Sequence, residues 1–360
     1  MTVTPVAPAP TPAKVHPRIH SSGSLDSYTP TILTPVIGNE FPKGSINIVD
    51  DILHAPNAEE RIRDLAVMIA ERGVVFFRAQ DNLTDDLQKT LVRRLGELTT
   101  RPVGHDLYIH PLLNSVLEYG ESDPQLSAIS SLQRKRLYEE GINMGTLAAI
   151  WHTDTPFERA PGDFSALRIT LLPETGGDTL WASGYELYDR LSKPYRQFVE
   201  TLTVSYEADG FRDVARKSGV NLYTDARGSP LNVGTELTAE HPVVRTNPIT
   251  GWKSIFPVGS WTKKINGLRV RESENLLKYF QDTVTLGHDL QVRFKWHDPN
   301  DIALWDNRST FHSATFDFDG LGERRGKRAI GIGEVPYFDP TSRSRREDLG
   351  LEDTLPVVHL

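Results

Sequence analysis

Apolar positions in the first third of the chain follow a helical spacing that one continuous apolar run interrupts. Residues 59–72 place apolar side chains three or four positions apart, and Gly73 follows where such a helix would end. Val74–Phe77 is apolar throughout, as expected of a strand buried on both faces. Thr84 can cap a second helix, whose leucines between residues 87 and 98 share one face. The pattern therefore predicts a helix, a buried strand and a second helix in succession.

Short apolar stretches separated by turn residues dominate from Ser165 onward. They predict helices at 185–203 and 273–285, and strands at 166–172, 178–182, 241–246, 252–256, 291–296, 302–305, 310–316 and 327–332. Residues 247–251 form a hairpin signal between two of these strands. Early helices followed by many short strands favour a mainly β fold, with an antiparallel core and flanking helices, over a doubly wound α/β sheet.

The two ends of the chain differ from its body in composition. Residues 1–35 hold seven prolines and lack apolar periodicity, which predicts a flexible or extended arm over residues 1–36. The body shows no internal repeat and no break in composition that would divide it. We expect one domain over residues 37–340 and a C-terminal tail over residues 341–360.

Composition narrows the chemistry chiefly through what is missing. The chain has 40 Lys and Arg against 48 Asp and Glu, a net charge of −8, which argues against a nucleic-acid partner. It has no cysteine, so disulfides, iron–sulfur clusters and thiol nucleophiles are excluded, and any metal must be held by His, Asp or Glu. Without an apolar stretch of about 18 residues or a secretory signal, we expect a cytoplasmic protein with no membrane span.

Common catalytic and nucleotide-binding signatures are also absent. The chain has no G-x-x-x-x-G-K-[ST], H-E-x-x-H or G-x-S-x-G motif. Gly331-Ile332-Gly333 begins like a dinucleotide fingerprint, but Pro336 stands where the third glycine belongs.

The most informative stretch is Trp151-His152-Thr153-Asp154. On an extended segment His152 and Asp154 point to the same side, so an imidazole and a carboxylate can reach one ion. A second histidine from a neighbouring strand, such as His312, would complete a two-histidine, one-carboxylate face that leaves open positions on iron(II). Because the H-x-D pattern is short, the motif taken alone favours the interpretation of His152 as a hydrogen-bonded strand histidine.

A basic segment follows His312 twelve and sixteen residues later. On a strand Arg324 and Arg328 share a face while Arg325 points away. An inward guanidinium beside a metal-ligand strand suits a dicarboxylate cosubstrate, because its planar fork matches a carboxylate. A solvated, charged edge strand is the alternative interpretation of this segment.

Taken together and in order, these residues resemble the taurine dioxygenase (TauD/TfdA) family of iron(II)/2-oxoglutarate-dependent dioxygenases. The resemblance rests on residues 151–154, Leu172–Trp181, Trp305–Arg308, His312 and the arginine pair, and it covers roughly residues 37–340. It implies a double-stranded β-helix, that is, a cupin-like jelly roll, flanked by helices. The implied activity is an oxidoreductase that consumes 2-oxoglutarate and dioxygen and releases succinate and carbon dioxide.

The resemblance also assigns roles by position. His152, Asp154 and His312 match the iron(II) ligands, which would make them the catalytic centre. Arg324 matches the residue that binds the distal carboxylate of 2-oxoglutarate, with Arg325 as the rival candidate, and Thr179 matches a hydroxyl that supports the same carboxylate. Homodimers and homotetramers occur among such enzymes, so the resemblance allows a homo-oligomer.

The same comparison predicts an anion-binding substrate pocket. Arg328 and His110 match contacts to a substrate sulfonate, and Phe157 and Trp261 are candidate apolar walls, although either aromatic ring could equally belong to the ordinary core. Ala148 and Leu113 stand where taurine-specific members often carry Asn and Tyr. These two differences make the pocket less polar, and they argue against taurine itself.

The leading hypothesis is hydroxylation of a small anionic substrate, an organosulfonate first of all, with release of sulfite and an aldehyde. The alternative within this chemistry is hydroxylation or desaturation of a carboxylate, a sulfate ester or a specialised metabolite. Two hypotheses of other classes are a jelly-roll binding protein that has lost catalysis and a hydrolytic zinc enzyme. The complete triad opposes the first, and Arg324 would have no evident role in the second.

Overall fold

The computed structural model describes residues 18–112, 123–132 and 151–351. Its helices are α1 (Ala58–Arg72), α2 (Asp85–Glu97), α4 (Gly184–Asp189), α5 (Lys193–Val199), α6 (Asp209–Ser218), α7 (Val270–Leu286) and α8 (Arg345–Asp348), with a π-helical segment at Ile48–Leu53 and a 3-10 turn at His288–Leu290. Its strands are β1 (Thr31–Ile32), β2 (Asn39–Phe41), β3 (Val74–Phe77), β4 (Ser127–Ser130), β5 (Gly162–Leu171), β6 (Thr179–Ser183), β7 (Thr203–Glu207), β8 (Thr238–Pro242), β9 (Val244–Thr246), β10 (Lys253–Ile255), β11 (Thr262–Ile265), β12 (Gln291–Phe294), β13 (Ile302–Asp306), β14 (Thr310–Ala314) and β15 (Arg325–Ile332).

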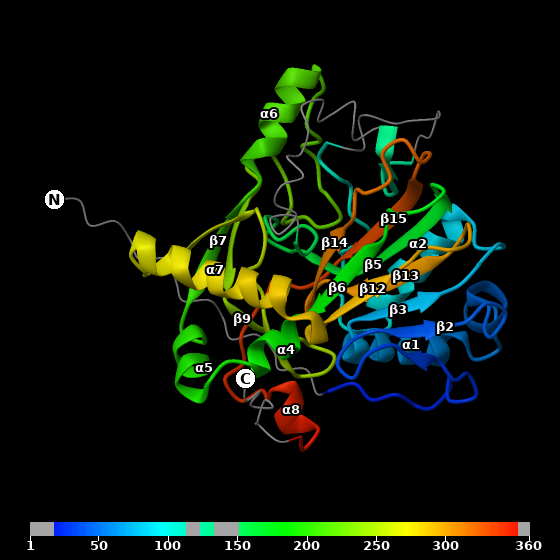
Figure 1. The fold of residues 1–360 in the computed structure, drawn as a ribbon, viewed down its shortest axis with the longest axis horizontal. Coiled ribbons are helices and arrows are strands. Elements are labelled where there is room, and N and C mark those ends of the chain that lie inside the picture. Colours follow the sequence, from blue (N-terminus) through cyan, green and yellow to red (C-terminus); the bar gives the residue numbers. More distant parts are fainter. Residues whose placement is uncertain (1–17, 113–122, 133–150, 352–360) are drawn as a thin grey trace.

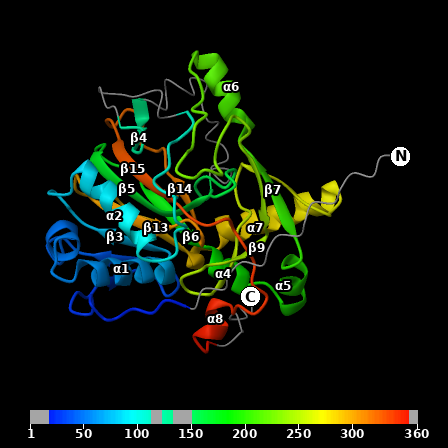
Figure 2. The same cartoon turned by 180° about the vertical axis from the view of Figure 1, so that it is seen from behind.

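Two sheets build the jelly roll. The larger has seven strands in the order β1-β2-β3-β13-β5-β15-β4, and the smaller has three in the order β12-β6-β14. Only β2 and β3 pair in parallel; the other neighbours in these sheets are antiparallel. Helices α1 and α2 lie against one face of the larger sheet, which is seen best from behind, and α6 projects from one end of the molecule (Figures 1 and 2). The predicted mainly β fold with flanking helices is confirmed.

Strand β3 shows how the sequence pattern produces the layers. Val75 and Phe77 join the apolar cluster under α1 and α2, whereas Val74 and Phe76 face the smaller sheet. The Phe76 ring stacks on Phe294 with ring centroids 4.0 Å apart. Successive side chains of a strand point to opposite faces, so an unbroken apolar run places one core on each side of the sheet.

The prediction of one long helix at 185–203 is wrong. Two short helices, α4 and α5, occupy this stretch, and residue 203 already begins β7. Pro194 lies in the first turn of α5, where its missing N–H costs nothing, whereas inside a continuous helix it would break the hydrogen-bond ladder. The other predicted elements are present, with shifted ends.

None of the described helices is both long and apolar enough to cross a bilayer.

The described part of the predicted N-terminal arm, residues 18–36, is bound to the body. Ile19 donates its backbone N–H to Ile249, and the hydroxyls and amides of Ser22 and Ser24 donate to Asp64 on α1 at 2.7–2.9 Å. Arg18 forms ion pairs with Glu71 and Asp348. The domain boundaries themselves stay predictions.

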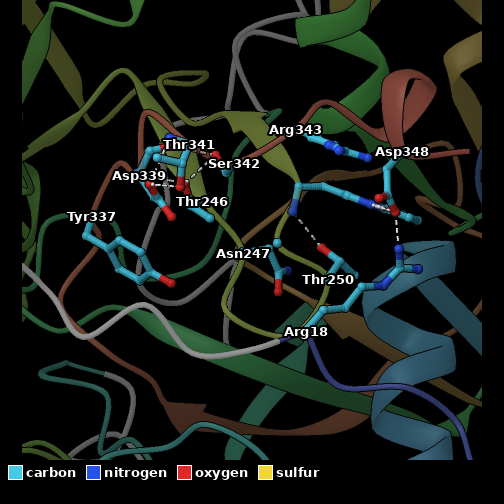
Figure 3. A pocket seen from close by; sticks show the side chains of 12 residues that line it. Arg18, Thr246, Asn247, Thr250, Tyr337, Asp339, Thr341, Ser342, Arg343 and Asp348 are labelled. Atoms are coloured by element: carbon cyan, nitrogen blue, oxygen red, sulfur yellow. Dashed lines mark hydrogen bonds and ion pairs between the residues drawn. The ribbon is translucent and has the colours of Figure 1, made fainter.

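A cavity of about 270 Å³, lined mostly by residues of polar type, lies where this N-terminal segment, the β9–β10 hairpin and the segment from Tyr337 to Asp348 meet (Figure 3). Its lining includes Arg18, Asn247 and Asp339. No side chain in the predicted catalytic, cosubstrate or substrate set lines this cavity.

Candidate active site

Two strand-like segments bring the two candidate histidine ligands together. His152 and His312 exchange backbone hydrogen bonds, N to O, at 3.0 and 2.7 Å, and their ring centroids lie 4.2 Å apart. Asp154, two residues beyond His152, faces the same side, and Asp154 Oδ1 lies 4.0 Å from His152 Nε2 and 3.7 Å from His312 Nε2. One ligand atom from each of the three residues lies within 4.8 Å of the others. Within the described residues no other group of three His, Asp or Glu side chains converges in this way.

Burial and charge favour the ligand forms of these groups. Burial and the neighbouring His152 ring hold the pKa of His312 well below 6.5, so its imidazole is neutral at neutral pH. Burial raises the pKa of Asp154, but Arg328 and the two histidines outweigh it and leave the pKa below 3.8. Two imidazoles and one carboxylate are the donor set that non-haem iron(II) prefers. The residues present therefore fit the metal that the sequence suggested.

Arg324 lies buried beside Thr179, as the predicted cosubstrate site requires. Its Nε donates to the Gly177 carbonyl at 2.8 Å and its Nη2 to Thr179 Oγ1 at 3.3 Å. Arg324 is 5% exposed, and no ion pair to it is found within residues that the structure describes. Burial lowers the pKa of Arg324 to about 10, so it stays cationic at neutral pH. A buried cation with neutral partners is a favourable place for a carboxylate.

Arg325 faces the other way. Alternation along β15 places it on the side of Lys327, which forms an ion pair with Asp85 on α2. Arg324 and Arg328 lie on the opposite side, toward the candidate ligands. Of the two rival arginines, only Arg324 contacts Thr179 in the described structure.

Arg328 and His110 flank the same space. Arg328 Nη1 donates to Asp154 Oδ1 at 2.7 Å, a contact that the sequence did not predict. His110 Nδ1 accepts from the Leu112 amide at 3.1 Å, while burial and the charge of Arg328 lower the pKa of His110 to about 3. The imidazole is therefore neutral with its proton on Nε2, which makes that nitrogen a hydrogen-bond donor.

Aromatic rings form one wall beside His152. Trp261 lies 5.1 Å from the His152 ring and 5.2 Å from Phe157, measured between ring centroids. Phe211, in the first turn of α6, lies 5.5 Å from Phe157 and 5.1 Å from His110. The sequence reasoning missed Phe211, although the apolar spacing of residues 211, 214 and 215 could have indicated this helix. Ala148 and Leu113, the two predicted departures, lie outside the described residues.

Comparisons with known proteins agree with this geometry. The family model "Taurine catabolism dioxygenase TauD, TfdA family" matches residues 31–330. The chain is 45% identical over 330 residues to the alpha-ketoglutarate-dependent dioxygenase oryG of Aspergillus oryzae, covering 91% of this chain and 94% of that one. It is 33% identical to a putative alpha-ketoglutarate-dependent sulfonate dioxygenase of Schizosaccharomyces pombe, covering 79% of this chain and 66% of that one. A putative alpha-ketoglutarate-dependent taurine dioxygenase from Burkholderia xenovorans has a similar structure, with a TM-score of 0.65 and 26% identity, covering 87% of this chain and 95% of that one.

Proposed function

This chain belongs to the TauD/TfdA family of 2-oxoglutarate-dependent dioxygenases, and we propose that it hydroxylates a small anionic substrate at an iron(II) centre held by His152, Asp154 and His312. The observation that carries the proposal is the convergence of one ligand atom from each of these residues within 4.8 Å. A hydrolytic zinc enzyme and a binding protein without catalysis are set aside, because the family and its relatives are dioxygenases.

Different side chains around the metal would bind the cosubstrate and exclude water. When bound, iron(II) and 2-oxoglutarate together activate dioxygen and yield succinate, carbon dioxide and a hydroxylated substrate carbon. Arg324 would bind the distal carboxylate of 2-oxoglutarate through its remaining N–H groups, with the Thr179 hydroxyl beside it. Phe157 and Trp261 would exclude water from the reacting carbon.

Arg328 and His110 would bind the substrate anion. The guanidinium supplies charge and the His110 Nε2–H supplies a neutral donor, while the aromatic wall accommodates an apolar body. An organosulfonate fits this combination, and a relative named as a putative sulfonate dioxygenase supports it. If the hydroxylated carbon bears the sulfonate, the product collapses to an aldehyde and sulfite.

A second candidate is hydroxylation or desaturation of a carboxylate, a sulfate ester or a specialised metabolite. It is favoured by the higher identity, 45%, to a relative whose name specifies 2-oxoglutarate dependence and no sulfonate. A cytoplasmic location and a dimeric or tetrameric assembly complete the proposal. Sizing of the purified protein by light scattering tests the assembly.

Two measurements test the activity. Succinate release by the purified protein should require iron(II), 2-oxoglutarate and a substrate, and His152→Ala should abolish it; full turnover in that variant would refute the iron site. A panel of sulfonates, sulfate esters and carboxylates, scored for sulfite and for oxidised product, then separates the two candidates. Sulfite with aldehyde supports the first, and oxidation of carboxylates without sulfite supports the second.

A further inference from the structure

Two buried polar side chains with no part in the proposed chemistry contact Asp154. Ser165 on β5 is fully buried, and its Oγ donates to Asp154 Oδ2 at 3.1 Å. Asn307, in the turn between β13 and β14, is 1% exposed, and its Oδ1 accepts from the Asp154 backbone N–H at 3.3 Å. The Thr153 hydroxyl also donates to the Asn307 carbonyl at 2.7 Å. Hydrogen bonds from the Thr153 side chain and from the Asp154 backbone therefore both hold the segment that carries Asp154 against this turn.

The orientation of the Asn307 amide follows from its neighbours. Trp305 Nε1 can only donate, and it lies 2.9 Å from Asn307 Oδ1, so the oxygen must face the indole. The amide nitrogen consequently faces the other way, 2.6 Å from Ser165 Oγ and 3.2 Å from the Asp163 carbonyl oxygen. The Asn307 oxygen accepts two hydrogen bonds and the amide nitrogen donates two, which uses the full hydrogen-bonding capacity of this side chain.

This arrangement gives the hydrogen-bond chain a direction. Because Asn307 Nδ2 donates to Ser165 Oγ, the single hydroxyl proton of Ser165 is free to point at Asp154 Oδ2. The other carboxylate oxygen, Oδ1, is the one that faces the two histidine Nε2 atoms.

We propose that Asn307, acting through Ser165, is a positioning residue that keeps Asp154 Oδ2 turned away and presents Oδ1 alone to the metal. The inference rests on the proposed iron site. Its consequence is a one-oxygen carboxylate ligand, which preserves the open coordination positions that the cosubstrates need. Without these contacts the carboxylate is free to rotate, so Oδ1 is no longer held in place for the ion and the site binds the ion more weakly.

Equilibrium binding of Mn²⁺ alone to the purified protein, followed by the electron paramagnetic resonance signal of the free ion, tests the inference without turnover. Loss of an outer hydrogen bond to a metal ligand typically weakens metal affinity about 10- to 100-fold. We expect that loss in Ser165→Ala, and near wild-type affinity in Ser165→Thr, which keeps the hydroxyl. Ser254→Ala is the matched control, since Ser254 is also fully buried but donates to the Ile255 carbonyl.

Asn307→Asp gives an independent test, in which the positioning role and the added negative charge predict opposite changes in Mn²⁺ affinity. The new side chain can still accept from Trp305 and from the Asp154 amide, but it offers Ser165 an acceptor in place of a donor and so draws the hydroxyl proton away from Asp154. We expect weaker Mn²⁺ binding, whereas the added negative charge by itself would tighten it. Far-UV circular dichroism establishes that each variant is folded, and Asn307→Asp decides the matter if Ser165→Ala does not fold.

The outcomes separate the two proposals. A wild-type protein that binds no Mn²⁺ refutes the metal site and the proposed function. A wild-type protein that binds Mn²⁺, with Ser165→Ala and Asn307→Asp binding it equally well or more tightly, overturns only the positioning role of Asn307.

Discussion

Replacing Arg324 by Gln tests how the cosubstrate is held. The Arg324 guanidinium, directly before β15, is buried and contacts Thr179, whereas alternation along the strand places Arg325 on the side of Lys327. Arg324→Gln removes the charge and the planar fork while keeping a side chain that can still donate to one neighbour. Arg325→Gln is the matched control, because it removes the same group one residue away on the other face of the strand.

The size of the effect follows from the donors available. An arginine has five N–H groups. Two of those of Arg324 are used by the Gly177 carbonyl and Thr179 Oγ1, so three remain for a carboxylate. Two charge-assisted hydrogen bonds contribute about 1.5 kcal/mol each at the low end. Their loss, about 3 kcal/mol, corresponds to roughly a 100-fold weaker interaction with 2-oxoglutarate, since each 1.4 kcal/mol is tenfold.

The assay is succinate formation as a function of 2-oxoglutarate concentration at saturating iron(II) and substrate. We expect the KM for 2-oxoglutarate to rise about 100-fold in Arg324→Gln and to stay within about threefold of wild type in Arg325→Gln. Arg324→Lys should fall between them, because it keeps the charge without the fork. A large rise confined to Arg325→Gln would refute the argument from strand alternation.

Three further predictions concern the substrate pocket and stability. Arg328→Gln should raise the KM for substrate about 10- to 100-fold with a smaller change for 2-oxoglutarate, because it removes one charge-assisted contact to the anion; the two KM values, measured separately, check this. Trp261→Ala should uncouple the reaction by opening the wall beside His152 to water, so succinate should exceed oxidised substrate when both products are quantified. Asp64→Asn should lower the free energy of unfolding at pH 7 by about 2 kcal/mol, because hydrogen bonds to Ser22 and Ser24 outweigh burial and keep the pKa of Asp64 below 3.8. That contribution is present above the unfolded-state pKa of about 4 and is lost as pH falls below it, so denaturation at pH 7 and pH 3 should show the difference shrinking.

Elements that depend on neighbouring residues, such as helix caps and short buried strands, were predictable from the sequence. The helix cap at Thr84 is present, with its hydroxyl accepting from the Leu87 amide at 3.3 Å, and Val74–Phe77 forms β3 with the expected two buried faces. The wrong prediction of one helix at 185–203 also has a local cause. Pro194 ends a continuous helix there, although the apolar residues around it keep a helical spacing. A separate three-stranded sheet in the order β11-β7-β8 was not predicted as a unit, because its strands are only four or five residues long.

The arrangement of the candidate site was predictable where it depends on residue spacing along one extended segment. Alternation placed His152 with Asp154, and it also placed Arg324 on the side opposite Arg325. The contact between Arg328 and Asp154 was not predictable, because it depends on the side-chain conformations of two residues that are 174 positions apart in sequence. Asn307 was part of the motif that suggested the family, yet its hydrogen bonds to Ser165 and Asp163 appear only once the turn is folded.

The charges of the proposed site favour a substrate with one net negative charge. Before any ligand binds, the site holds the Asp154 carboxylate, the buried Arg324 and the partly buried Arg328, while His312 and His110 are neutral. The charge of Asp178, which acts on Arg324, is already paired with Arg293. The proposed iron(II) adds two positive charges and 2-oxoglutarate adds two negative ones, so one positive charge stays uncompensated. Burying an unpaired charge is costly, and an anion beside Arg328 removes that cost. A simple sulfonate or carboxylate supplies the missing charge, whereas taurine, whose ammonium balances its sulfonate, does not.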